Sequence, residues 1–465
     1  MPVETLSRTG AVAMAIRTRI AERRLGAGDR LPSIRRLAQE MRVSPSTVVE
    51  AYDRLLAEGL IRSRPGSGFF VSAVSAPRSL AEAEPRPEPA IDPFWVSRQS
   101  LDADPAQPKP GCGWMPAGWM PNPAIRKALR ALARAPESLL ADYGQTRGSL
   151  PLRRLLARQL AGQDIATGAD QLMLTASGTR AIDLVCRLLL RPGDTVLVDD
   201  PCYFNFQALL TAHRAQIVAI PYTPEGPDPE AFAAAAAGTA PRLYITNSAL
   251  HNPTGATMTP RIAHRILGLA AAHDVVVVED DIFGDLEPEP SVRLASLDGL
   301  SRVIRIGSFS KTLSASVRCG YVAARPDWIE ALIDLQVATS FGGPSPLAAE
   351  LVLQVLGDGG YRRHLDGLHR RLAALRAEVA ERLAGLGITP WLVPRGGFLL
   401  WCRLPEGVDS ADLARLALAR GLVLAPGDVF SPTRSAAAFM RFNVTQMGGQ
   451  ELWRTLAEAM QAARR

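Results

Sequence analysis

The stretch "RVIRIGSFSKTLSASVRCGY" (302–321) begins as a short apolar run, becomes polar at its end and contains Lys311. Lysine is rare in this chain, which has 3 lysines against 49 arginines. A simple surface charge would therefore be expected to be an arginine. A lysine amine can lose its proton and form an imine with an aldehyde, whereas a guanidinium stays protonated. The position of Lys311 therefore raises the question of whether the rest of the chain provides a site for an aldehyde cofactor.

The composition is that of a globular protein with two or three domains: 465 residues, of which 47% are hydrophobic and 21% charged. No charged-then-apolar signal segment opens the chain, and the valine run from Val275 is far too short to span a membrane. The five cysteines are scattered without a CxxC pair, which argues against disulfides and a structural metal site. We expect a cytoplasmic protein with reduced thiols and without metal.

Positive charge is concentrated at the start of the chain. Residues 1–75 hold 12 arginines against 7 acidic residues, or +5 of the net charge of +6. A basic unit of this kind favours nucleic-acid binding, with a merely arginine-rich surface as the alternative. The range 76–110 is rich in proline and has the composition of a linker. We therefore expect a DNA-binding domain at 1–75, a linker at 76–110 and a larger body at 111–465.

The first domain has the pattern of three helices and a hairpin. Apolar residues spaced by four predict a helix over 8–24, and Ser33 is a candidate N-cap for a second, short helix. Ser44 followed by Pro45 is a strong start signal for a third helix, which Gly59 ends. "LIRSRPGSGFFV" predicts two short strands around a turn. This order indicates a winged helix-turn-helix.

"LGAGDRLPSIRRLAQEMRVSPSTVVEAYDRLLAEGLIRSRPGSGFFV" resembles the DNA-binding domain of the GntR family. The resemblance implies contacts to a double-stranded DNA operator from Arg35, Ser44, Ser46, Thr47, Arg62, Arg64 and Gly66. Pro45 stands where that family often has a basic residue, so sequence reading falls to other contacts. Without the resemblance, a wing-bearing protein-interaction domain is the alternative.

The body repeats one pattern, a short apolar run that ends in polar residues. The runs are "DQLMLTASGT", "DTVLVDDPCY", "RLYITNSALHNPTG", "DVVVVEDD" and "RVIRIGSFSK", with helical segments between them. Continuous apolar runs indicate strands buried on both faces, as in an α/β fold with a largely parallel sheet. Such sheets bind ligands beyond the carboxyl ends of their strands, and all five runs carry polar residues there.

These strand ends suit the parts of pyridoxal 5′-phosphate. The "SGT" turn at 177–179 precedes a helical segment whose first backbone amides can hold a phosphate, although such turns are also ordinary caps. Arg318 can donate two hydrogen bonds to the phosphate, and serine hydroxyls can donate further hydrogen bonds to it. The candidate phosphate ligands are Gly178, Thr179, Arg180, Ser308, Ser310 and Arg318.

Other strand ends suit the pyridine ring. Asp280 follows the valine run, and a carboxylate at the pyridine nitrogen keeps that nitrogen protonated, which makes the ring an electron sink. Asp281 is the rival for this role, and helix capping is the alternative for either. Asn252 in "NPTG" can bond the ring hydroxyl, with a plain turn as the alternative. Tyr203, just past a strand, can stack on the ring.

The motifs "SGT", "DPCYF", "HNPTG", "EDDIFGD" and "SFSKTLSASVRCGY", in this order and spacing, resemble fold-type I aminotransferases over the whole body. The resemblance implies that Lys311 is the Schiff-base lysine and that Arg441 in "FMRFNVT" holds a substrate carboxylate. It also implies a head-to-tail homodimer in which Tyr143 reaches the partner's phosphate, with a large part at about 140–330 and a small part at about 331–465. For Arg441, an edge-strand surface position is the alternative.

A GntR-like domain joined by a linker to an aminotransferase-like body resembles the MocR type of transcription regulators. Phe283 stands where the aminotransferases commonly have a tyrosine that bonds the ring hydroxyl. We therefore expect altered tuning of the cofactor, which favours ligand sensing over fast turnover.

Three hypotheses follow. In the first, the protein is a DNA-binding regulator, and an amine, amino acid or cofactor-related ligand at Lys311 changes the geometry of its paired DNA-binding domains. In the second, it is a working aminotransferase whose first domain is incidental to the chemistry. The third, a catalytically dead scaffold without cofactor, is disfavoured because Lys311 and Arg318 are both present.

Overall fold

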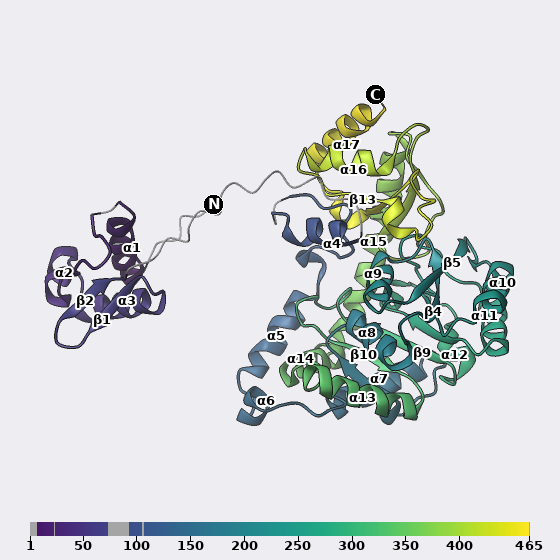
Figure 1. The fold of residues 1–465 in the computed structure, drawn as a ribbon, viewed down its shortest axis with the longest axis horizontal. Coiled ribbons are helices and arrows are strands. Elements are labelled where there is room, and N and C mark those ends of the chain that lie inside the picture. The colour runs from purple at the N-terminus through teal and green to yellow at the C-terminus, as the bar shows by residue number, and fades with distance from the viewer. Residues whose placement is uncertain (1–6, 23, 73–92, 105–106, 465) are drawn as a thin grey trace. The chain divides into compact units, whose positions relative to one another are not determined.

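The structure is a computed structural model that describes residues 7–22, 24–72, 93–104 and 107–464. The chain divides into two compact units, Met1–Pro89 and Ala90–Arg465 (Figure 1). Within the described ranges, no helix is long and apolar enough to cross a membrane. The same ranges contain no group of three or more His, Cys, Asp or Glu side chains that could hold a metal ion. All five cysteines are free and buried.

The first unit is a winged helix-turn-helix, as predicted. Its elements are α1 (Arg8–Ala21), α2 (Ile34–Met41), α3 (Pro45–Ala57), β1 (Ile61–Arg64) and β2 (Gly68–Val71), and the two strands form an antiparallel hairpin. The first helix ends three residues earlier than expected. The amides of Arg24 and Leu25 both donate to the Arg19 carbonyl, which closes the helix before the turn at Gly26.

Local caps and one shared core hold this unit together. The hydroxyls of Ser33 and Ser44 accept backbone amides at the starts of α2 and α3, and Pro45 occupies the first position of α3. Buried apolar side chains of all three helices and both strands form a single cluster. Within it, the fully buried Tyr52 of α3 donates to the Pro32 carbonyl at 2.8 Å, which ties α3 to the loop before α2.

The second unit is built on an eight-stranded mixed sheet in the order β3-β10-β9-β8-β7-β4-β5-β6. Its strands are β3 (Leu172–Thr175), β4 (Thr195–Asp200), β5 (Gln216–Thr223), β6 (Gly226–Pro227), β7 (Leu243–Thr246), β8 (Val276–Asp280), β9 (Val303–Ser308) and β10 (Gly320–Ala323). β4, β5, β7, β8 and β9 run parallel, while β10 runs antiparallel to both its neighbours. The α/β prediction is confirmed, and all five motif-bearing strand ends lie at one edge.

Helices cover both faces of this sheet (Figure 1). One face packs on α8 (Gly178–Leu189), α9 (Phe204–Ala212) and α13 (Pro326–Ser340). The other packs on α5 (Asn122–Leu132), α7 (Leu150–Ala161), α10 (Pro229–Thr239), α11 (Pro260–Ala272), α12 (Leu294–Asp298) and α14 (Pro346–Gly357). In β4, Val196 and Val198 face the first layer and Leu197 the second, which explains the continuous apolar runs in the sequence.

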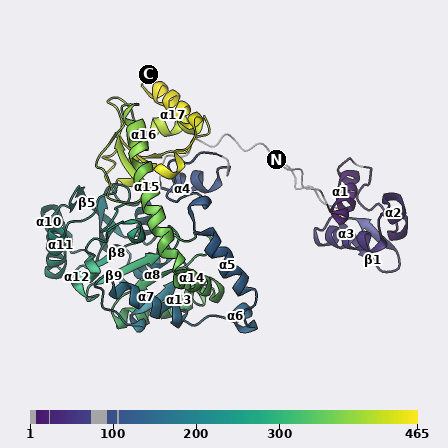
Figure 2. The ribbon, with the colours of Figure 1, turned by 180° about the vertical axis from the view of Figure 1, so that it is seen from behind.

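A four-stranded antiparallel sheet follows, in the order β11-β12-β14-β13. Its strands are β11 (Thr389–Pro390), β12 (Leu399–Arg403), β13 (Ala425–Pro426) and β14 (Phe439–Asn443). They share a core with α15 (Gly360–Ala384), α16 (Ser410–Leu418) and α17 (Gln450–Ala463). Figure 2 shows α15 running from the large sheet to this smaller one. β14 lies between two strands, so it is not an edge strand.

Two stretches depart from the expected domain bounds. Helix α14 packs on the large sheet through Ala349 and Val352, although we expected 331–465 to form the small part. Within the expected linker 76–110, residues Pro93–Asp102 form helix α4, because Trp95 and Val96 are buried against the second unit. The rest of that range up to residue 92 lies outside the described residues.

Two glycine substitutions test the packing of the large sheet. A Cβ at Gly307 in β9 would lie within the ring of Tyr321 on the neighbouring strand, so Gly307→Ala should lower the free energy of unfolding by about 1–3 kcal/mol or more. A Cβ at Gly268 in α11 meets no atom within 4 Å. Gly268→Ala should therefore stabilise by about 0.5–1 kcal/mol through helix propensity. Chemical denaturation measures both, and equal effects would contradict this packing.

Candidate functional site

The candidate site is a cavity of about 420 Å³ in the second unit, at the carboxyl ends of the strands. Eight of the residues predicted from the sequence line it: Gly178, Thr179, Tyr203, Asp280, Ser308, Ser310, Lys311 and Arg318. They come from the segments that follow β3, β4, β8 and β9. The sheet therefore brings together residues as far apart in the chain as Gly178 and Arg318.

Lys311 is held at this edge in a form suited to covalent chemistry. Burial, helped by the positive charge of Arg441, lowers the pKa of its amine to about 8. The Nζ atom donates to the Gly113 carbonyl at 2.6 Å and lies 5.4 Å from the centre of the Phe283 ring. A larger fraction of neutral amine is therefore present near neutral pH than for an ordinary lysine.

Asp280 ends β8 inside the cavity, and burial raises its pKa to about 7. Its Oδ1 atom is buried without a hydrogen-bond partner in the described part of the chain. An unpaired buried carboxylate oxygen needs a donor from outside the chain, and a protonated ring nitrogen is such a donor. The neighbouring Asp281 also has an Oδ1 atom without a hydrogen-bond partner in the described part of the chain, but its Oδ2 atom pairs with Arg293 and Arg305. Burial opposes the ionisation of Asp281, but these two arginines outweigh burial and lower its pKa. Of the two rivals, Asp280 lines the cavity and Asp281 does not.

The small-residue turn and the β9 end form a polar cradle. Ser177 caps α8 by accepting the amide of Arg180 at 3.0 Å, and the first two residues of the helix, Gly178 and Thr179, line the cavity. A Cβ at Gly178 would approach Ile282 to 3.3 Å, so the close packing there favours glycine. Arg318 lines the same cavity with φ of 53°, a conformation that non-glycine residues rarely adopt and that clusters at functional sites. Ser308 and Ser310 are linked to each other at 3.1 Å.

Arg180 is placed differently from the other predicted phosphate ligands. Its guanidinium donates to the Asp183 carboxylate at 2.5 Å and to the Thr339 hydroxyl, and it does not line the cavity. The Arg180 side chain is therefore held by partners on α8 and α13 and is not available to a ligand in the cavity. The backbone amide of Arg180 donates to the Ser177 hydroxyl at 3.0 Å.

Arg441 is buried in the interior strand β14, which excludes the surface alternative. Burial lowers the pKa of its guanidinium to about 10. Nη1 donates to the amide oxygen of Asn252 at 2.9 Å, and Nη2 donates to the Gly111 carbonyl at 2.6 Å. Because Arg441 engages the oxygen of Asn252, the amide nitrogen of Asn252 is the group left to donate to a ring hydroxyl. The Nε atom of Arg441 has no partner among the described residues.

The aromatic residues of the site have distinct positions. Tyr203 lines the cavity, and burial raises the pKa of its hydroxyl. Phe283 is buried beside Lys311 and packs on Phe398, but it is not among the residues that line the cavity. Trp114 lines the cavity, whereas Met115 belongs to the core of the small sheet. Trp119 lies under the guanidinium of an arginine on α15, outside the cavity lining.

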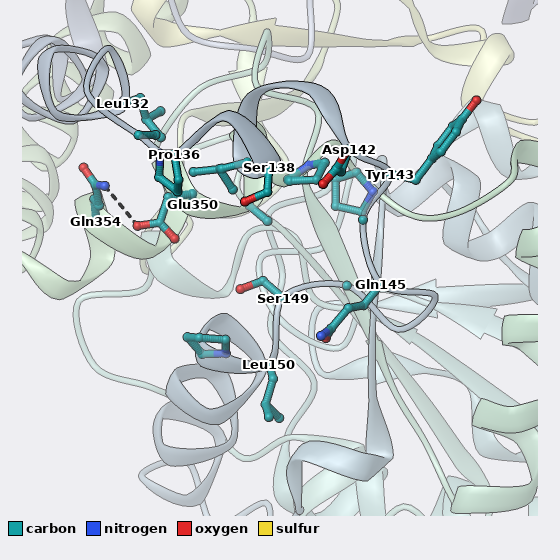
Figure 3. Close-up of a pocket in the computed structure, with 18 of the residues that line it drawn as sticks. Leu132, Pro136, Ser138, Asp142, Tyr143, Gln145, Ser149, Leu150, Glu350 and Gln354 are labelled. Atoms are coloured by element: carbon teal, nitrogen blue, oxygen red, sulfur yellow. Dashed lines mark hydrogen bonds between the residues drawn. The ribbon is translucent and has the colours of Figure 1, made fainter.

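Tyr143 lies apart from this cavity. It borders a second cleft of about 670 Å³ between the end of α5 and the start of α14, shown in Figure 3. Its ring is 82% exposed, extends away from the other labelled side chains and contacts only the exposed Phe341 among the described aromatic rings. Within one chain, Tyr143 therefore makes no contribution to the Lys311 cavity.

The predicted DNA-contacting residues are on the outside of the first unit. Arg35, Ser44, Ser46, Arg62, Arg64 and Gly66 are exposed, and Thr47 is half-buried. Ser44 bonds to the hydroxyls of Ser46 and Thr47 at 2.8 and 2.7 Å, so the start of α3 is a compact hydroxyl cluster. Other arginines of this unit have carboxylate partners, such as Arg17 with Glu58. No described carboxylate lies within ion-pair distance of Arg35, Arg62 or Arg64.

Several contributors to the site were not predicted from the sequence. Leu101 of α4 lines the cavity, and the carbonyls of Gly111 and Gly113 accept from Arg441 and Lys311. Asn247 donates to the backbone carbonyl of Asp280 at 2.7 Å. The glycines of "PGCGW" were a usable signal for close backbone approach, because a Cβ at Gly111 would overlap the backbone of Leu424. Leu101 had no signal, since it lies in a proline-rich stretch.

Both units match known families. Residues 8–71 match the bacterial regulatory proteins of the gntR family, and residues 116–459 match aminotransferase class I and II. The HTH-type transcriptional regulator YjiR of Escherichia coli is 30% identical over 434 residues, which cover 90% of each chain. The HTH-type transcriptional regulator NorG of Staphylococcus aureus is 26% identical and covers 86% of this chain and 92% of its own.

Solved aminotransferases share the fold of the second unit. LysN, the α-aminoadipate aminotransferase of Thermus thermophilus, is 25% identical with a TM-score of 0.72, over 79% of this chain and 95% of its own. Its structure holds N-(5'-phosphopyridoxyl)-L-leucine. The multiple substrate aminotransferase of Thermococcus profundus is 26% identical with a TM-score of 0.72, over 81% of this chain and 96% of its own.

The lowered pKa of Lys311 predicts how its reactivity depends on pH. Above about pH 8 the amine is mostly neutral, whereas an ordinary lysine reaches that state only near 10.5. Trapping with pyridoxal 5′-phosphate and borohydride should therefore label Lys311 at a rate that rises with pH and levels off above about pH 8. Lys311→Ala should remain folded and unlabelled. A mass-spectrometric adduct on Lys109 or Lys127 in place of Lys311 would overturn the assignment.

Proposed function

The chain belongs to the HTH transcription regulators in which a GntR-type DNA-binding domain is fused to an aminotransferase class I and II domain, and from this premise we propose that pyridoxal 5′-phosphate binds at Lys311. We also propose that an amine or amino acid bound at the same site regulates the binding of the protein to a DNA operator. The observation that carries the proposal is the pairing of a buried, low-pKa amine with the unpaired buried carboxylate of Asp280 in one cavity.

The residues of the cavity fit each part of the cofactor. Lys311 supplies the amine for its aldehyde, and Asp280 the acceptor for its ring nitrogen. Arg318, with the serine hydroxyls and the start of α8, supplies donors for its phosphate. When bound, pyridoxal 5′-phosphate provides a covalent attachment point for amines and an electron-withdrawing ring. The phosphopyridoxyl ligand of LysN supports the same choice of cofactor.

Arg441 is the proposed partner of a ligand carboxylate. The guanidinium is buried near Lys311, although Arg441 is not among the residues that line the cavity. Its hydrogen bonds within the described chain go to neutral acceptors, the Asn252 amide oxygen and the Gly111 carbonyl. An anion would form a stronger, charge-assisted pair than these neutral groups. The carboxylate would also offset the repulsion between Arg441 and a protonated Lys311.

A head-to-tail homodimer would give the exposed aromatic pair a role. Tyr143 and Phe341 are 82% and 68% exposed and lie against one another, and Leu140 nearby in the chain is also exposed. We propose that this face meets a second copy, where Tyr143 reaches the partner's phosphate-binding region. Two DNA-binding units in one assembly would then address two half-sites of an operator.

A working aminotransferase is the second candidate function, favoured by one observation. The lysine, the ring carboxylate and the carboxylate-binding arginine are all present in the second unit, where Asp280 and Arg441 are buried and Lys311 is half-buried. Adding an amino acid and then a keto acid to the cofactor-loaded protein separates the two candidates. Repeated turnover at ordinary enzyme rates, without any preference for the DNA upstream of its own gene, would favour the enzyme.

The exposed, unpaired arginines predict a salt-dependent interaction with DNA. Each arginine–phosphate contact releases a counterion, so affinity should fall steeply with salt. Arg35→Ala, Arg62→Ala and Arg64→Ala in the full-length protein should each reduce the slope of log affinity against log salt by roughly one unit. Arg54→Ala is the matched control, because Arg54 lies on α3 but pairs with Glu50. Fluorescence anisotropy measures these slopes, and unchanged slopes in all three test variants would contradict the proposed DNA surface.

A further inference from the structure

The segment that enters the second unit contributes one residue to the Lys311 cavity and hydrogen-bonds to two of the site's charged side chains. Helix α4 contributes Leu101 to the cavity lining. Farther along, the Gly111 carbonyl accepts from Arg441 Nη2, and the Gly113 carbonyl accepts from Lys311 Nζ, each at 2.6 Å. We call residues 93–104 and 107–113 the entry segment. It is the first described part of the second unit, and the DNA-binding unit precedes it in the chain.

Helix α4 rests on the elements that carry the ligand-binding residues. Trp95 and Val96 are buried in the same core as Phe204 and Phe430. Phe204 begins α9 directly after Tyr203, and the Phe430 ring lies 4.7 Å from the Arg441 guanidinium. A displacement of Tyr203 or Arg441 at the cavity therefore acts on Phe204 and Phe430, which belong to the core against which α4 packs.

The two ends of the entry segment are joined. Lys109 Nζ donates to the Ala103 carbonyl at 3.0 Å, just after α4. The backbone then pairs with the small sheet region, since Val423 N donates to the Pro108 carbonyl at 3.1 Å and Gly111 N donates to the Val423 carbonyl at 2.9 Å. A displacement of Gly111 is therefore transmitted to α4 through few bonds.

One buried polar group of helix α4 lacks a hydrogen-bond partner in the described part of the chain. Ser100 Oγ is buried with no hydrogen-bond partner among the described residues, and an unsatisfied buried hydroxyl costs about 1–3 kcal/mol. Leu101, the next residue, is 71% exposed although it is a large apolar side chain. Both features lower the cost of moving α4, and covering Leu101 would be favourable.

The lining that the cofactor does not need is apolar. The polar and charged lining groups are Ser177, Thr179, Tyr203, Asp280, Ser308, Ser310, Lys311 and Arg318, all assigned above to the cofactor region. The remaining lining residues are Leu101 of the entry segment, Trp114 directly after it, Gly178, Ile182, Ile282 and Ala315. A second charge on a ligand would lose its hydration there without gaining a partner, whereas an apolar side chain would cover Leu101 and Trp114.

We propose that the ligand of the Lys311 cavity is an amino acid with an apolar side chain and that the entry segment reports its presence to the DNA-binding unit. The inference rests on the proposed function, in which Lys311 holds the cofactor. The ligand carboxylate competes with the Gly111 carbonyl for Arg441, and the ligand side chain contacts Leu101. Both contacts distinguish the liganded state from the free state, which is the condition for a ligand to shift a conformational equilibrium.

The test uses the full-length, cofactor-loaded protein and DNA from upstream of its own gene. L-Leucine and L-phenylalanine should each change the dissociation constant for this DNA by at least about threefold, whereas L-aspartate and L-lysine should not. In Leu101→Ala, leucine should need a higher concentration to change the cofactor absorbance, because one contact to its side chain is removed, and at saturating leucine the DNA response should be lost. Leu101→Met should retain the response. Leu297→Ala is the matched control, because Leu297 on α12 is 46% exposed and lies outside the cavity lining.

The outcomes separate this inference from the function on which it rests. A response to aspartate or lysine as large as that to leucine would contradict the ligand class. A full DNA response in Leu101→Ala would contradict the role of the entry segment. If the cofactor binds at Lys311 and the DNA is bound, but leucine has no effect on DNA affinity, this inference fails alone. If no adduct forms at Lys311, the proposed function fails first.

Discussion

The candidate site of the second unit depends on holding the Lys311 amine away from water at the carboxyl edge of the sheet. Burial disfavours its charged form, and the nearby buried Arg441 adds repulsion. The carboxylate that lines the same cavity, Asp280, has its own pKa raised to about 7 and one oxygen unpaired among the described residues. Such a site is costly for a protein that leaves it empty, because its polar groups lack partners that a charged, phosphate-bearing ring would supply. The unpaired polar groups of the site lower the free energy of unfolding of the protein and at the same time provide partners for a bound cofactor.

This requirement explains how the second unit is assembled. Strand ends of one sheet supply Asp280 and Lys311, and the second, smaller sheet supplies Arg441 from an interior strand. Arg441 joins three parts of the chain, since it bonds to Asn252 after β7 and to Gly111 of the entry segment. A ligand carboxylate that reaches Arg441 therefore acts on the contact between the two sheets and on the segment that follows the DNA-binding unit in sequence.

The sequence was sufficient to predict those features that depend on neighbouring residues in the chain. The caps Ser33 and Ser44 and the polar ends of β8 and β9 were predicted from neighbouring residues alone, because strand ends and helix starts have local signals. The sequence did not predict features that are determined by contacts between residues far apart or by the surroundings of a side chain in the fold. The Arg180 side chain pairs with Asp183 one turn along the same helix, and α4 forms in a proline-rich stretch because Trp95 finds a core to enter. The position of Tyr143 relative to a phosphate depends on a second copy of the chain and stays a prediction.

The central claim is that occupancy of Lys311 controls the affinity of the same chain for DNA. The most direct measurement compares the affinity of full-length wild-type protein and Lys311→Ala for DNA upstream of its own gene, each with and without pyridoxal 5′-phosphate. The account predicts that the cofactor changes the affinity of the wild type severalfold and leaves that of Lys311→Ala unchanged. Equal affinities in all four conditions, with the adduct on wild-type Lys311 verified by mass spectrometry, would contradict it.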